Sequence, residues 1–94
     1  MTPQEQLIQL AKEIKSKSNT RLDDKSPEWI MGRAMTEPLC YYRGGDYRKA
    51  IFVTRKDKTI IVTEKTIGET HKVVDNRMIF EPFETSEVIL TIDL

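Results

Sequence analysis

The chain has 94 residues and carries 15 basic and 15 acidic side chains, so its formal net charge is zero at pH 7. A chain of this length buries roughly 60–68% of its unfolded surface, enough for one hydrophobic core, and we expect a single domain over residues 1–94. The neutral balance excludes a global field that favours nucleic acid or a membrane, so any electrostatic attraction must be local.

The single cysteine, Cys40, excludes an internal disulfide and a multi-cysteine zinc site. This cysteine usage fits a reducing compartment. No apolar run approaches the roughly 20 residues that a membrane helix needs, and the polar N-terminus is unlike a secretory signal. We therefore expect a cytoplasmic protein with no membrane partner.

The first predicted element is a helix. Thr2 and Glu5 have the spacing of a capping box, and Pro3 stands at the first helical position. The residues that follow have the i, i+3, i+4, i+7 spacing of one buried face, and the helix should end near Ser18 and Asn19. The members of that face are Leu7, Leu10, Ala11 and Ile14.

A second, shorter helix is predicted after a polar connection. Ser26 and Pro27 repeat the cap-plus-proline signal, and the helix should run to about Met35 before Pro38 forces an extended chain. It carries Trp29, the only tryptophan. We expect this ring to plug the core over the sheet.

From Leu39 onward the apolar pattern changes to the period of two that indicates strands. Every connection is too short for a parallel crossover, so the sheet should be an antiparallel meander. The predicted fold is α+β, with both helices packed on five or six strands; a half-open barrel is the variant. The six candidate strands are Leu39 to Arg43, Tyr47 to Thr54, Thr59 to Lys65, Thr70 to Val74, Arg77 to Phe83 and Val88 to Asp93. The predicted turns are Gly44-Gly45, Lys56-Asp57, Ile67-Gly68, Asp75-Asn76 and Glu84 to Glu87.

Short turns fix which side chains share a face of the sheet. The predicted core face collects Cys40, Tyr42, Ile51, Val53, Ile60, Val62, Val73, Met78, Phe80, Leu90 and Ile92. On the opposite face Phe52, Ile61 and Val74 should form an apolar row, continued by Leu39 or Tyr41 on one side and by Ile79 on the other. Three explanations stay open for this row: the Trp29 helix covers it, the sheet curls over it, or it is a subunit or partner interface.

Few side chains are suited to catalysis or metal binding. A metal site needs several ligands, whereas the chain offers one histidine, His71, and one cysteine. The predicted register places His71 on the core side with Glu64 opposite, which is typical of a structural histidine, and Cys40 lies in an apolar strand. We therefore expect no metal, no cofactor and no enzymatic activity; a hydrolase that uses His71 is a distant alternative.

The richest candidate surface surrounds the Gly44-Gly45 turn, which is too short for a phosphate loop. Aromatic and cationic side chains alternate there, and such rings can stack on bases while the cations neutralise phosphates. The same cations could instead protect strand ends from edge pairing. The predicted ligand-binding residues are Tyr41, Arg43, Tyr47, Arg48 and Lys49.

Two functions follow from these patterns. The first is a small non-enzymatic binding protein, homo-oligomeric, that engages a phosphorylated ligand such as single-stranded nucleic acid or a nucleotide through those five residues. The alternative is a protein–protein interaction module, an inhibitor or adaptor, that docks a larger partner through an apolar sheet face or an edge strand. The predicted interface residues are Leu39, Phe52, Ile61, Val74 and Ile79.

Overall fold

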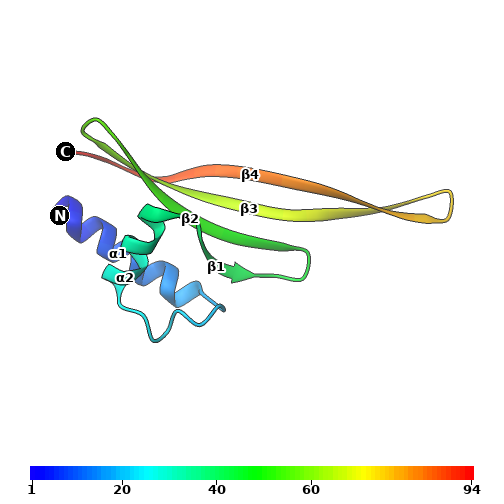
Figure 1. The fold of residues 1–94 in the computed structure, drawn as a ribbon, viewed down its shortest axis with the longest axis horizontal. Helices are drawn as coiled ribbons and strands as arrows, with labels where there is room; N and C mark the ends of the chain where they lie inside the picture. The colour runs from blue at the N-terminus through cyan, green and yellow to red at the C-terminus, as the bar shows by residue number, and fades with distance from the viewer.

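The computed structural model describes residues 1–94 and shows two helices packed on an open four-stranded antiparallel sheet (Figure 1). The strands follow one another in space as they do in sequence, as the predicted meander requires. The α+β class is confirmed, but the sheet has four strands rather than five or six. The elements are α1 (Pro3–Lys17), α2 (Pro27–Thr36), β1 (Leu39–Arg43), β2 (Tyr47–Lys56), β3 (Thr59–Val74) and β4 (Arg77–Asp93).

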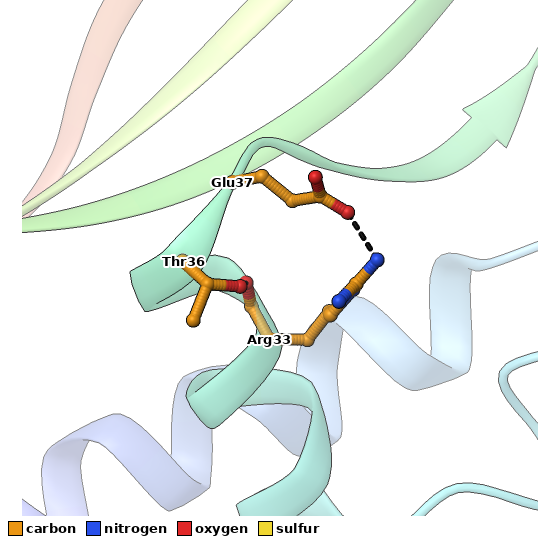
Figure 2. A network of polar contacts seen from close by, with 3 residues as sticks. All are labelled: Arg33, Thr36 and Glu37. Atoms are coloured by element: carbon orange, nitrogen blue, oxygen red, sulfur yellow. Dashed lines mark hydrogen bonds and ion pairs between the residues drawn. The ribbon is translucent and has the colours of Figure 1, made fainter.

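Both helices begin at the predicted caps. The Thr2 hydroxyl accepts a hydrogen bond from the Glu5 amide at 3.1 Å, and the Ser26 hydroxyl accepts one from the Trp29 amide at the same distance. Each cap satisfies an amide that has no partner within its helix. Helix α2 ends where the Glu37 amide donates to the Arg33 carbonyl, and Figure 2 shows the Arg33 guanidinium paired with the Glu37 carboxylate at this end.

The core lies between the helices and one end of the sheet. The buried helix residues are Leu7, Ala11 and Ile14 from α1 and Ile30, Met31 and Ala34 from α2; the buried sheet residues they cover include Ile51, Val53, Val62 and Ile92. The prediction that Trp29 plugs the core is wrong, because its side chain is 42% exposed and the Lys25 ammonium lies 5.0 Å from its ring centroid. Ile30 and Met31 fill that space instead.

Two of the five predicted turns, Ile67-Gly68 and Glu84 to Glu87, are wrong, because strands β3 and β4 continue through them. Gly68 pairs with Phe83, and the stretch from Glu84 to Glu87 stays in register with β3. Gly68 does not have a positive φ, so its backbone is not bent into a turn. The predicted turn at Asp75 and Asn76 is confirmed, and the φ angles of 52° and 61° at these residues suit a two-residue hairpin loop.

The long hairpin of β3 and β4 therefore projects beyond the rest of the sheet (Figure 1). Strand β2 stops pairing with β3 at Gly68, so residues 69–82 form a ribbon of only two strands, which we call the arm. The molecule measures 56 × 31 × 20 Å, and its Cα radius of gyration is 15.9 Å. A compact chain of this length would have a radius of about 12 Å, so the arm makes the molecule elongated.

The register assigns side chains to a helix-side face and an outer face. In the arm, Val73, Met78, Phe80 and His71 lie on the outer face, so their predicted placement in the core is wrong. The reason is that no turn occurs at Gly68. The side chains of β3 therefore keep alternating between the two faces without interruption, which puts the arm residues on the face opposite to the predicted one.

The first strand also departs from the predicted alternation. A bulge between Cys40 and Tyr42 leaves Tyr41 as the extra residue, and Tyr41 is buried at 4% exposure. Cys40 shares a face with Ala50 instead of the core residues, whereas Leu39 packs against the core. The bulge therefore exchanges the predicted faces of Leu39, Cys40 and Tyr41.

The two edges of the sheet are guarded differently. Along β1, the Asn19 side chain accepts from the Arg43 amide and donates to the Arg43 carbonyl, both at 2.8 Å, and the Thr20 hydroxyl donates to the Cys40 carbonyl. Along β4 no such cover exists, but Pro82 interrupts the edge. Because the Glu69 amide donates toward β2, its partner Pro82 directs its missing N–H toward the open edge.

No helix in the structure combines the length and apolar character that a membrane crossing requires.

Two substitutions test whether the core is confined to the part of the sheet under the helices. Ile51→Ala should lower the free energy of unfolding by about 2–5 kcal/mol, because Ile51 is fully buried and the change leaves a cavity. Ile79→Ala in the arm should cost less than about 1 kcal/mol, because Ile79 is 37% exposed and lies beyond the helices. Urea unfolding measures both values, and an equal loss of stability for the two variants would contradict this division.

Candidate functional site

The hairpin of β1 and β2 docks against β3 through a glycine. A Cβ atom built on Gly68 would lie 2.4 Å from the Asp46 carbonyl oxygen and 2.8 Å from the Tyr47 Cβ. The absence of a side chain lets the Glu69 amide donate to that carbonyl at 3.0 Å. Gly68 thus places the Gly44-Gly45 turn beside the start of the arm.

Tyr41 has a structural role on the helix-side face. Its hydroxyl donates to a Glu64 carboxylate oxygen at 2.6 Å, and Lys49 lies 3.7 Å from the other oxygen of the same carboxylate. Burial, the hydrogen bond to Glu64 and the charge of that carboxylate together raise the pKa of Tyr41 above its ordinary value. The ring is therefore unavailable for stacking on a base without loss of this network.

Tyr42 and Tyr47 stack on each other at a centroid separation of 5.7 Å and an interplanar angle of 27°. Together with Tyr41, Lys49 and Lys17 they line a helix-side depression of about 350 Å³. The two lysines make this depression cationic, although Lys49 already faces Glu64. Because the two rings cover each other, each of them has at most its outer face left to stack on a base.

A second depression, of about 550 Å³, lies on the outer face where the hairpin meets the arm. Its charged lining includes Arg43, Arg48, Asp46 and Glu69, and His71 lies 3.8 Å from the Asp46 carboxylate. Two cations and two anions leave this groove without a net charge when His71 is neutral. Its apolar floor comes from residues that include Ile67, Phe80 and Pro82.

The five predicted ligand-binding residues are divided between these two depressions. Tyr41, Tyr47 and Lys49 come together on the helix side, whereas Arg43 and Arg48 line the outer groove. Tyr47 borders both because it lies at the end of the hairpin. A single ligand would have to wrap around the hairpin to contact all five.

The predicted interface row is not assembled. Phe52 pairs with Thr63 and Ile61 pairs with Thr54, while Val74 pairs with Arg77 at the tip of the arm. Phe52 is partly covered by Lys65, whose ammonium lies 5.0 Å from the ring centroid. On the outer face of the sheet, Phe52 is therefore covered in part by a lysine of the neighbouring strand, and not by the Trp29 helix.

The remaining two interface residues lie apart from that face. Leu39 packs against the core on the helix side, and Ile79 pairs with Lys72 in the arm. Val74 and Ile79 share the helix-side face of the arm, beyond the reach of both helices.

Sequence reasoning missed the most exposed apolar surface. Val73, Met78 and Phe80 lie on the outer face of the arm and are 68%, 59% and 53% exposed. The signal that could have found them is the near-equal length of the two extended stretches on either side of the Asp75-Asn76 turn. No group of three histidine, cysteine or carboxylate side chains comes together in a way that could hold a metal ion.

Neither a protein-family model, nor a curated protein, nor a solved structure matches this chain. A function has to be inferred from its own residues.

The Tyr41–Glu64 hydrogen bond predicts a pH-dependent contribution to stability. Tyr41→Phe should lower the free energy of unfolding at pH 7 by about 1–3 kcal/mol, because the carboxylate loses its donor. The folded-state pKa of Tyr41 is raised, so the unfolded chain loses this proton first, at pH of about 10. The stabilisation is therefore fully present below pH 10 and is lost as the pH rises toward the folded-state pKa.

Urea unfolding at pH 7 and above pH 10 measures this difference, with Tyr42→Phe as the control. The difference in free energy of unfolding between the native chain and Tyr41→Phe should be smaller above pH 10 than at pH 7. If this difference in free energy stays constant or increases above pH 10, the contact with Glu64 does not favour the protonated phenol.

Proposed function

We propose that this chain is a protein–protein interaction module whose arm docks on another polypeptide. The observation that carries the proposal is the exposure of Val73, Met78 and Phe80 on one face of the arm, with Val74 and Ile79 exposed on the other. A ribbon of two strands is marginally stable in water by itself, and exposed apolar patches of this kind mark interaction surfaces. A partner that covers the arm would stabilise this ribbon and bury its exposed apolar side chains.

Because both edges of the sheet are protected against pairing, a partner is expected to pack against a face of the arm and not to add a strand to the sheet. Asn19 and Thr20 occupy the hydrogen-bonding groups of the β1 edge, and Pro82 removes a donor from the middle of the β4 edge. These are devices that discourage edge-to-edge pairing. Of the two docking modes considered from the sequence, the sheet face therefore has the better support.

A photo-crosslinking side chain at Val73 or Met78 tests this proposal in the source cell. Both positions should give a nuclease-resistant adduct with protein in high yield, whereas a crosslinker at Glu13 on the exposed side of α1 should not. Absence of any protein adduct from the arm positions, with the chain folded, would show that the arm is not an interaction surface.

A second candidate function uses the outer groove. Arg43 and Arg48 lie in one depression beside Tyr47, an arrangement that suits a phosphorylated ligand such as a nucleotide or single-stranded nucleic acid. Asp46 and Glu69 in the same groove reduce the electrostatic attraction. This candidate therefore ranks below docking of the arm.

Arg43→Ala with Arg48→Ala separates the two candidates. If the groove binds phosphates, the double variant should weaken binding of a single-stranded oligonucleotide and lower the slope of its affinity against salt by up to about two, one for each lost contact. Fluorescence anisotropy at low salt measures the affinity, with Arg55→Ala as a cation control at the far turn. Absence of binding by the native chain at low salt would remove this candidate.

A further inference from the structure

The side chains along the outer face of the arm are arranged so that the face of one copy can complement the same face of a second copy. Its distal half is apolar and contains Val73, Met78 and Phe80. Where the arm meets the sheet, Ile67 and Pro82 continue the apolar surface as far as the two arginines of the outer groove. The surface thus passes from an apolar end to an apolar floor, beside which Arg43 and Arg48 lie together with Asp46 and Glu69.

Charge is also separated along the chain. Residues 1–63 contain twelve basic and eight acidic side chains, for a net charge of +4, and residues 64–94 contain three basic and seven acidic ones, for a net charge of −4. Locally, the hairpin residues 43–49 have a net charge of +2 and the arm residues 69–82 a net charge of −1. A neutral chain with two regions of opposite charge attracts a second copy placed in the reverse direction.

We propose that the arm packs with its outer face against the outer face of the arm of a second copy, in antiparallel orientation. A two-fold axis near His71 and Phe80 places each apolar tip on the partner's groove and each acidic arm beside the partner's basic hairpin. Parallel packing would instead bring like charges together. The arrangement is isologous and closed, so it gives a dimer rather than a fibre.

The guarded edges are consistent with this mode. Two sheets that pack face to face need no free backbone groups, so neither Pro82 nor the cover of β1 by Asn19 obstructs the contact. The inference rests on the proposed function, because it identifies the polypeptide that the arm contacts as a second copy of the chain.

Sedimentation equilibrium of the purified chain tests the dimer. The monomer has a mass of 11.0 kDa, and at about 100 µM the weight-average mass should be at least about 1.8 times that value for any dimer whose Kd is about 10 µM or lower. Phe80→Asp should return the mass to that of one chain. Thr70→Asp is the matched control, because it places the same charge in the arm beside His71 but on the helix-side face, and it should leave the dimer intact.

A cysteine pair locates the contact. In a Cys40→Ser background, His71→Cys should form a covalent dimer with a short bis-maleimide, whereas Lys72→Cys on the opposite face should not. Raising the salt concentration should weaken the dimer of the native chain.

A mass of one chain at about 100 µM, or a dimer that Phe80→Asp leaves unchanged, overturns the inference. Equal crosslinking of His71→Cys and Lys72→Cys overturns it as well. Adducts from Val73 and Met78 with a different protein would leave the proposed function standing while the dimer fails, and absence of every adduct would remove both.

Discussion

The two helices are too short to cover the sheet on which they pack. Helix α1 has 15 residues and a length of about 22 Å, whereas β3 has 16 residues and extends for about 50 Å. The core is consequently confined to the half of the sheet that contains Ile51 and Val62. The exposed arm, the elongated shape and the proposed interaction surface all follow from this difference in length.

Close approach at Gly68 sets the geometry of the candidate site. A side chain at this position would collide with the Asp46 carbonyl, so the end of the β1–β2 hairpin approaches β3 this closely because residue 68 is glycine. The pleat then sends Tyr47 and Lys49 to the helix side and Arg48 to the outer side. A cluster that is continuous in sequence is for this reason divided between two faces in space.

Features that depend on local chemistry could be predicted from the sequence, as Thr2 and Ser26 show at the starts of the helices. The antiparallel order and the core positions Ile51, Val53 and Val62 also followed from short connections and alternation. Glycine was misleading at residue 68, because close backbone packing and a turn both call for a residue without a side chain.

The bulge at Tyr41 was unpredictable for a similar reason. The bulged residue donates its hydroxyl to Glu64, 23 residues away in sequence, and alternation within β1 carries no trace of such a long-range contact. The missing turn at Gly68 moved the later β3 side chains, including Val74, to the other face, and the bulge moved Leu39 and Tyr41. Phe52 and Ile61 kept their shared outer face, so the predicted interface row was divided between the two faces.

Amide hydrogen exchange of the chain at a concentration where it is monomeric tests the confinement of the core most directly. We expect the β3–β4 amides of residues 70–81 to exchange far faster than those of residues 51–53, because the arm can open without disturbing the core. The arm amides should slow when a partner covers them. Arm amides that are as slow as the core amides in the isolated monomer would contradict the confinement of the core to one half of the sheet.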